Sequence, residues 1–311
     1  MKKIIFLFMI SLGLCLTSSL SAKEPGKSLR VVCTILPIYS LTLNVVNGIS
    51  GVGVELLLPP QQGCPHNYDL TPGDLIKLSR ADLIIANGLG MEEFLGNALK
   101  QGHLKARVIE AAEKVKPIGN TPAASHPHYS KNPTAIDHDH DGSVNGHAWV
   151  SPKAATIMVR TIADGLALQD PVHEREYLFN AKQYSTRLEG LAREMWEWVS
   201  QAKNKKCLAF HDVLAYLARD IGLTIIGVIE AHPGVEPSPK DMIRLIYLLK
   251  SQKAAAIFSE PQYSDKIART LSCESGVPLF ELDPVATGKP AADSYEKAMR
   301  KNLEILRNAV K

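Results

Sequence analysis

Three histidines and one aspartate occupy positions where strand-like runs end or a helix is about to begin. His66 follows an apolar run inside the segment PHNY, His211 follows the run LAF, and Asp283 follows the run LFEL and precedes a proline. His147 lies four residues before Ser151, and the serine–proline pair there is typical of a helix start. Taken singly, each has a structural explanation: a loop histidine, the end of a polar tract, a hydrogen-bonded core histidine and a turn cap.

The joint placement of these four side chains favours a metal site. Neutral imidazole and carboxylate groups are ligands that zinc accepts, and zinc prefers four of them in a tetrahedron. His66 and His147 come from the first half of the chain, and His211 and Asp283 from the second. One ion held by all four would therefore clamp the two halves together.

The elements that must position these residues alternate between short apolar runs and helical stretches. In the first half, strand-like runs occupy residues 29–36, 52–58 and 83–86, and a weaker one begins at residue 108. Helical candidates at residues 40–47, 72–79 and 91–99 lie between them. Short apolar strands that alternate with helices indicate a parallel sheet covered on both faces.

The second half repeats this pattern after a long amphipathic stretch. A helix is predicted from Ser151-Pro152 to about residue 168, and a longer one over 173–203, where Gly190 is the one helix-breaking residue. Strand-like runs follow at residues 207–210, 224–229, 254–258 and 279–282, with a final helix at 294–309. The fold class is therefore α/β, with two doubly wound parallel-sheet domains joined by one long rigid helix. Ligands of such sheets bind at the carboxyl ends of strands, so the cleft between the domains is the expected site.

The predicted domain organisation follows from these elements. Residues 1–22 form a signal peptide, 29–171 an N-terminal metal-binding domain, 172–203 the connector helix, and 204–311 a C-terminal metal-binding domain. Residues 117–146 form a polar, histidine-rich loop whose length is typical of a functional or disordered segment. Its flexible side chains could capture metal weakly, the alternative being a solvated spacer; the candidate ligands are His126, His128, His138 and His140.

The first residues predict export. Lys2 and Lys3 precede a short apolar run, and small residues follow it, as in a secretory signal peptide. We therefore expect a periplasmic protein; a lipid anchor on Cys15 is the less favoured alternative because bulky Leu14 precedes it. Removal of the two lysines reduces the net charge from +3 to about +1, which argues against a nucleic-acid partner.

The cysteines leave two interpretations open. Cys33, Cys64, Cys207 and Cys273 remain after export, and in an oxidising compartment they could pair, for example as a Cys207–Cys273 disulfide. Cys33 and Cys207 lie in apolar runs, so they are equally well explained as core residues.

Short segments spread over nearly the whole mature chain resemble the cluster A-I solute-binding proteins, the zinc and manganese receptors of ABC importers. The resemblance rests on segments that occur in the family order. They are LLPP (57–60), PHNY (65–68), PGD (72–74), ADL (81–83), NGLG (87–90), HAW (147–149), FHD (210–212), EPSP (236–239), SEPQ (259–262) and LDP (282–284).

This resemblance implies a function and a ligand set. In that family the positions matching His66, His147, His211 and Asp283 bind the metal, and histidine at the position of His211 favours zinc, with manganese possible. It implies a monomeric, non-enzymatic receptor that delivers zinc to an inner-membrane permease, and the loop at 117–146 resembles a short version of the histidine-rich loop of zinc-specific members. The family usually has aspartate where this chain has Ser151, but both residues cap helices.

Three alternatives stay open on the sequence alone. One is a manganese or iron receptor of the same type. The second is an exported zinc hydrolase, although four protein ligands would leave no position for water and the sequence has no His-Glu-x-x-His motif. The third is a surface adhesin or metal-sequestering protein, which would need lipid on Cys15.

Overall fold

The computed structural model describes residues 28–60, 65–100, 106–119, 144–230 and 236–311. Within these ranges the strands form two parallel four-stranded sheets. The first has the order β2-β1-β3-β4, and its strands are β1 (Leu29–Cys33), β2 (Val52–Leu56), β3 (Leu83–Ala86) and β4 (Arg107–Glu110). The second has the order β6-β5-β7-β8, and its strands are β5 (Lys206–Ala209), β6 (Thr224–Val228), β7 (Ala256–Ser259) and β8 (Leu279–Glu281). The predicted α/β class with two parallel sheets is confirmed.

The two sheets share one connection pattern. In each, the first strand of the half lies between the second and the third, so the winding direction reverses between β1 and β3 and again between β5 and β7. Ligands of open α/β sheets bind outside the carboxyl ends of the strands at such reversal points. A ligand-binding site is therefore expected among the residues that follow β1, β3, β5 and β7.

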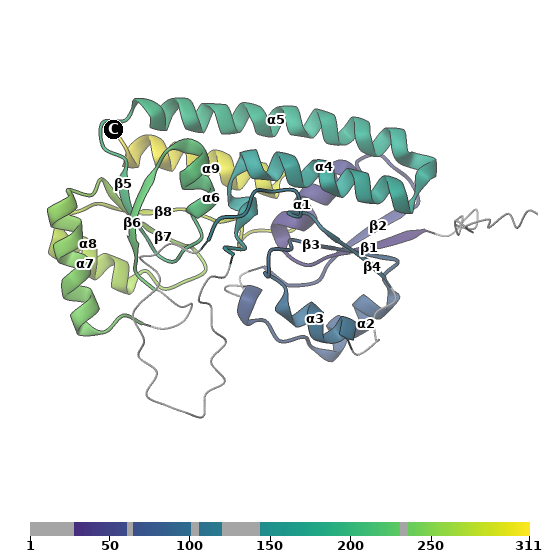
Figure 1. The fold of residues 1–311 in the computed structure, drawn as a ribbon, viewed down its shortest axis with the longest axis horizontal. Helices are drawn as coiled ribbons and strands as arrows, with labels where there is room; N and C mark the ends of the chain where they lie inside the picture. Colours follow the sequence, from purple (N-terminus) through teal and green to yellow (C-terminus); the bar gives the residue numbers. More distant parts are fainter. Residues whose placement is uncertain (1–27, 61–64, 101–105, 120–143, 231–235) are drawn as a thin grey trace, which may run out of the picture.

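Helices cover the sheets in layers. Figure 1 shows α5 (Glu174–Gln201) running along one side of both halves, with α4 (Pro152–Gln169), α9 (Ser294–Ala309), α1 (Leu36–Val45) and α6 (Ala215–Ile221) between it and the sheets. On the opposite side lie α2 (Pro72–Arg80) and α3 (Glu93–Lys100) under the first sheet. The second sheet is flanked by α7 (Pro239–Gln252) and α8 (Lys266–Ser275). None of the described helices combines the length and the hydropathy needed to cross a membrane.

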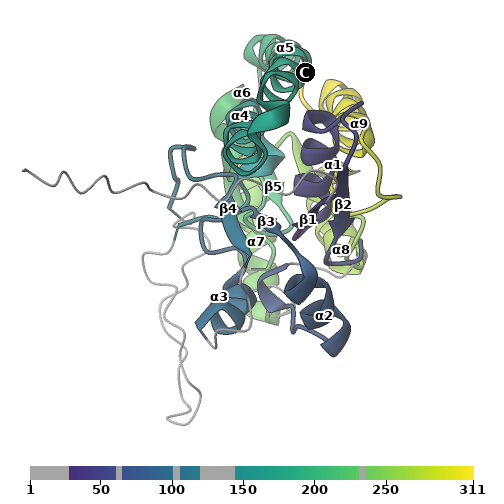
Figure 2. The same cartoon turned by 90° about the vertical axis from the view of Figure 1, so that its right-hand side faces the viewer.

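The long helix α5 joins the halves as predicted, and the last helix adds a second connection. Figure 2 shows α9 beside α1, far apart in sequence, and α5 packs against both. Ala292, just before α9, accepts hydrogen bonds from Ser40 Oγ (2.8 Å) and Asn44 Nδ2 (2.7 Å) of α1. The largest group of buried apolar side chains accordingly includes residues of both sheets, from Leu29 to Val310. The domain boundaries given above remain a prediction.

Two sequence expectations need correction. The strand predicted over residues 29–36 ends at Cys33, because Pro37 lies in the first turn of α1, where its missing N–H is not needed. The suggested Cys207–Cys273 disulfide is absent: among the described cysteines, Cys33 and Cys207 are buried free thiols and Cys273 is an exposed one. Cys15 and Cys64 lie outside the described residues, as does the predicted signal peptide.

The contact between α4 and β4 gives a test of packing. Gly165 is buried in α4, and a methyl group there would overlap the side chain of Ile109 on β4. Gly165→Ala is therefore expected to lower the free energy of unfolding by about 1–3 kcal/mol, measured by urea denaturation. Gly190 in α5 is the matched control: no described atom lies within 4 Å of a methyl group added there. Gly190→Ala should therefore stabilise the helix by about 0.5–1 kcal/mol. Equal effects of the two changes would contradict the packing described.

Candidate metal centre

His66, His147 and His211 meet at the carboxyl ends of strands from both sheets. His66 lies on the 3₁₀ turn Pro65–Asn67 after β2, and His147 lies immediately before the turn Ala148–Val150 that leads into α4. His211 follows β5 after one intervening residue. The centre of the His147 ring lies 5.6 Å from that of His66 and 5.3 Å from that of His211, so His147 is the middle member.

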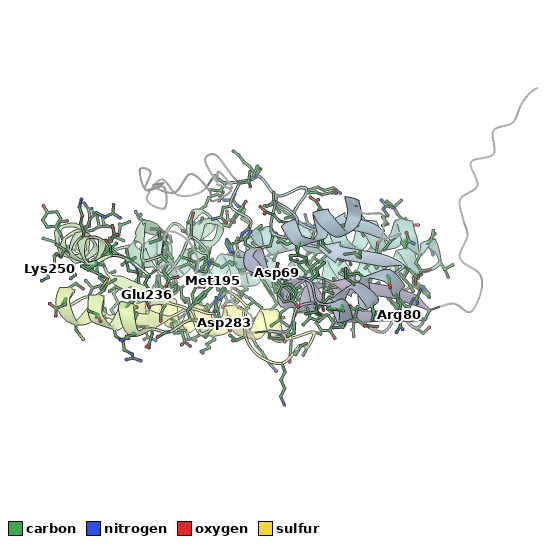
Figure 3. All side chains as sticks on the ribbon, turned by 90° about the horizontal axis from the view of Figure 1, so that it is seen from below. Asp69, Arg80, Met195, Glu236, Lys250 and Asp283 are labelled. Carbon is green, nitrogen blue, oxygen red and sulfur yellow. The ribbon has the colours of Figure 1, made fainter. Side chains whose placement is uncertain are left out.

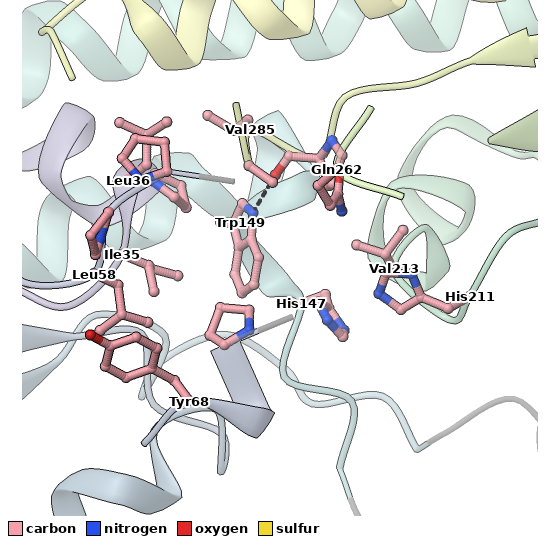
Figure 4. Close-up of a pocket in the computed structure, with 16 residues that line it drawn as sticks. Ile35, Leu36, Leu58, Tyr68, His147, Trp149, His211, Val213, Gln262 and Val285 are labelled. Atoms are coloured by element: carbon pink, nitrogen blue, oxygen red, sulfur yellow. Dashed lines mark hydrogen bonds between the residues drawn. The ribbon is translucent and has the colours of Figure 1, made fainter. Parts of the chain in front are cut away.

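Two of the three rings, those of His147 and His211, line a small, mostly apolar cleft, and Pro65, the neighbour of His66, lines it as well. Figure 4 shows His147 and His211 on one side of it, with Trp149 above and Tyr68 opposite. The cavity has a volume of about 50 Å³, which is room for only a few water molecules at about 10–15 Å³ each. A cavity of this size suits a metal ion rather than an organic ligand.

The rings are poised to bind a metal but do not form a finished coordination shell. Zinc–nitrogen bonds of about 2.0–2.1 Å in a tetrahedron place ligand nitrogens roughly 3.4 Å apart. Within the described ranges, no three His, Cys, Asp or Glu side chains form a ready-made metal site.

The protonation state of His147 suits a ligand. Burial, and then the neighbouring His211 and His66, lower the pKa of His147 well below its ordinary value of 6.5. The ring is therefore neutral at pH 7 and can offer a lone pair. By contrast, burial raises the pKa values of Cys33 and Cys207 to about 12, so these thiols are protonated and are poor ligands.

His211 is held by a buried carboxylate across the second reversal point. Its Nδ1 lies 2.6 Å from Glu260 Oε1, and both side chains are almost fully buried. Glu260 follows β7 directly, and its other oxygen accepts a hydrogen bond from Gln262 Nε2 at 2.7 Å. A carboxylate behind a metal-binding imidazole fixes the orientation of the ring and makes the ring a stronger ligand.

The recorded hydrogen bonds of the Asp283 carboxylate are made to the turn that follows it and not to the three histidine rings. Its two carboxylate oxygens accept hydrogen bonds from Ala286 N (2.9 Å) and Thr287 Oγ1 (2.5 Å) in the turn that follows it. Figure 3 shows Asp283 near the middle of the molecule's length, with Arg80 and Lys250 toward opposite ends. The next residue, Pro284, lines the same cleft as the histidines. The structure thus brings three of the four predicted ligands together, whereas the carboxylate of the fourth, Asp283, is hydrogen-bonded within the turn that follows β8.

The segment that carries His147 is fastened to the first sheet through a buried glutamate. Asn87 Nδ2 donates to the carbonyl of Gly146 (2.8 Å), and the backbone N–H of Asn87 donates to Glu92 Oε1 (2.7 Å). Glu92 also accepts from Thr34 Oγ1 (2.7 Å) and from the N–H of Gly88 (3.0 Å). Burial nevertheless dominates and raises the pKa of Glu92 to about 6.

The raised pKa of Glu92 predicts how the stability of the protein depends on pH. Because the pKa of Glu92 is higher in the folded than in the unfolded protein, protonation of this carboxyl favours the folded state. Its contribution to the free energy of unfolding is complete below the unfolded pKa of 4.5 and is lost as the pH rises through about 6. The wild type should therefore gain about 2 kcal/mol relative to Glu92→Gln as the pH falls from 7.5 to 4. Urea unfolding of both proteins across this range measures the difference. Parallel pH profiles would show that burial of Glu92 has no such effect.

One residue of the site was not identified from the sequence, and another stood out only as a carboxylate at a strand end. The latter is Glu260, which the order of the sheet places beside His211. Asn145 gave no sequence signal, yet it is buried beside His147, and its Oδ1 accepts a hydrogen bond from the His147 N–H at 2.9 Å. The candidate loop ligands His126, His128, His138 and His140 lie outside the described residues.

Comparison with known proteins places this geometry in a family. Residues 31–309 match the family model described as "Zinc-uptake complex component A periplasmic". The chain is 28% identical to the high-affinity zinc uptake system protein ZnuA of Bacillus subtilis over 93% of this chain and 90% of that protein. A crystal structure of the solute-binding protein FpvC of Pseudomonas aeruginosa with Ni²⁺ matches with a TM-score of 0.77 and 28% identity, covering 91% of this chain and 97% of FpvC.

Some relatives are longer than this chain. The chain is 29% identical to the zinc-binding lipoprotein AdcA of Streptococcus pneumoniae over 99% of its own length but only 61% of AdcA. What AdcA does as a whole protein therefore does not transfer directly.

Proposed function

Because this chain belongs to the family of periplasmic zinc-uptake component A proteins, we propose that it binds zinc outside the cytoplasm and delivers it to an ABC importer permease. The observation that carries this proposal is the meeting of His66, His147 and His211 from both halves, beside a small cleft that His147 and His211 line. Three imidazoles satisfy most of a tetrahedral zinc shell, and His66 and His211 follow strands of the two sheets, on the side where α/β sheets bind ligands. Manganese is a possible second cargo.

Asp283 is the proposed fourth ligand. Each of its carboxylate oxygens accepts one hydrogen bond, from Ala286 N and Thr287 Oγ1, and keeps a second lone pair with which it could bind a metal held by the three rings. The turn after β8 would then close over the cleft, which Pro284, Val285 and Ala286 already line. Four protein ligands leave no position for a catalytic water, so the site is that of a receptor and not of a hydrolase.

The experiment that tests the function is elemental analysis of the purified protein, followed by competition titration of zinc and manganese against a chelator of known affinity. One tightly bound zinc per chain, preferred over manganese, is the expected result. The absence of tight binding of any divalent metal would overturn the proposal. Preference for manganese would retain the receptor and change its cargo.

The histidine-rich loop is proposed as a weak accessory site that raises the local zinc concentration near the cleft. Deletion of residues 125–141 should leave the tight binding of one ion intact and remove only weaker binding events in calorimetry. Loss of the tight site on deletion would contradict this assignment.

The mature protein is further proposed to act as a periplasmic monomer, which size-exclusion chromatography with light scattering checks.

A further inference from the structure

Each of the four polar atoms of Asn145 has a hydrogen-bond partner. Its backbone N–H donates to Ile118 O (2.7 Å), and its carbonyl accepts from Tyr216 Oη (2.8 Å). Its side-chain Nδ2 donates to the carbonyl of Asp212 (2.6 Å). Its Oδ1 accepts from the His147 N–H (2.9 Å) and lies 3.2 Å from His147 Nδ1. With 2% of its surface exposed, Asn145 has no access to water that could replace these partners.

These partners determine which way the amide points. A backbone carbonyl can only accept, so the side-chain nitrogen of Asn145 must face Asp212. A backbone N–H can only donate, so the oxygen must face His147. An amide oxygen 3.2 Å from His147 Nδ1 accepts a hydrogen bond, and therefore Nδ1 carries the ring proton. In a neutral imidazole this leaves the lone pair on Nε2, the nitrogen then available to a metal.

Asn145 also joins the segments that carry two of the proposed ligands. Asp212 is the residue after His211, and Tyr216 lies on α6 of the second half. His147 and Ile118 belong to the first half. One side chain thus orients the His147 ring and ties its segment to the backbone next to His211.

We propose that Asn145 is a positioning residue that holds His147 in the Nδ1–H tautomer. It thereby directs Nε2 toward the metal that His211 would also bind. This inference rests on the proposed function for the identity of the metal, but the tautomer itself does not depend on it. A carboxylate oxygen of Glu260 lies 2.6 Å from His211 Nδ1, a contact that favours the same tautomer in His211. Both rings would then offer Nε2 to the cleft.

The first test needs neither a variant nor a metal. Long-range ¹H–¹⁵N spectra of the metal-free protein distinguish the two neutral tautomers by the shifts of the ring nitrogens. The proposal requires the Nδ1–H form for His147 near pH 7.5. An Nε2–H form would overturn it, whether or not the protein binds zinc, so failure of this inference is separable from failure of the proposed function.

The second test uses variants. Asn145→Ala should weaken zinc binding about 10–100-fold in chelator competition, the range found when a partner of a ligating histidine is removed. Asn145→Asp keeps an oxygen toward His147 and should recover most of the affinity, although it loses the donor to Asp212. The proposal would be overturned if Asn145→Ala bound zinc with wild-type affinity. It would also be overturned if Asn145→Asp kept the wild-type His147 tautomer but did not recover the zinc affinity.

Asn180→Ala is the matched control for the loss of a bridging amide. Asn180 Nδ2 donates to the carbonyls of Val45 (3.0 Å) and Asn47 (2.9 Å), at a distance from the histidines along α5. Its loss should lower the melting temperature without changing the zinc affinity or the His147 tautomer. An equal loss of zinc affinity in Asn180→Ala would reduce the role of Asn145 to general stability and overturn the proposal.

Discussion

His211→Ala is expected to weaken zinc binding by at least about 100-fold. Structural zinc sites bind with roughly 10–16 kcal/mol, and one of four ligands therefore accounts for about 3 kcal/mol, or about two orders of magnitude. His211 is buried and oriented by Glu260, so no other side chain can easily take its position. Chelator competition at pH 7.5 measures the change.

His173→Ala is the control for the loss of an imidazole. The His173 ring lies 2.8 Å from Asp170 in the turn before α5 and takes no part in the cleft. Its replacement should leave zinc affinity unchanged. If His211→Ala also retained wild-type affinity, the ligand set proposed for the cleft would be wrong.

The second large effect is expected at Trp149. This side chain is 4% exposed, and its Nε1–H donates to the carbonyl of Pro284 at 2.7 Å, a residue of the other half (Figure 4). The backbone carbonyl of Trp149 accepts from Tyr295 Oη at 2.6 Å, which adds a link to α9. Trp149→Ala removes the ring from a packed interior and should lower the free energy of unfolding by about 3–5 kcal/mol.

Trp149→Phe separates packing from hydrogen bonding. It keeps an aromatic ring but leaves the buried Pro284 carbonyl without its donor, at a cost of about 1–3 kcal/mol. The exposed Trp196 offers the control, since Trp196→Phe should change stability by less than about 0.5 kcal/mol. Urea unfolding followed by circular dichroism ranks the three variants. A Trp149→Ala protein as stable as Trp196→Phe would mean that Trp149 does not join the halves.

The sequence predicted the sheets well because their strands are short apolar runs bounded by Pro, Gly or Asn. β3 and α9 begin and end where the pattern placed them. Pro37 was misread because proline ends a strand and also starts a helix, and only the surrounding packing decides between these roles. Ser151 was read correctly, since its side chain accepts the N–H of Ala154 at the start of α4.

The position of His211, a proposed ligand, was predictable for a different reason: parallel sheets bring the carboxyl ends of their strands to one edge. That rule places His211 and Glu260 beside the cleft without any knowledge of contacts. Asn145 could not be found in this way, because its role depends on partners 67 and 71 positions away along the chain. The rule placed Asp283 correctly at a strand end, but it could not predict that the following turn takes up both carboxylate oxygens.

The contact between α1 and α9 has a consequence for the order in which the protein folds. Ser40 bonds to Ala292 and Tyr295, partners that lie 252 and 255 positions further along the chain. Pairings of such long range form slowly, because the entropy of closing a large loop must be overcome first. α1 therefore cannot reach its final environment until nearly the entire chain is available, and early folding of the first half alone leaves this face uncovered.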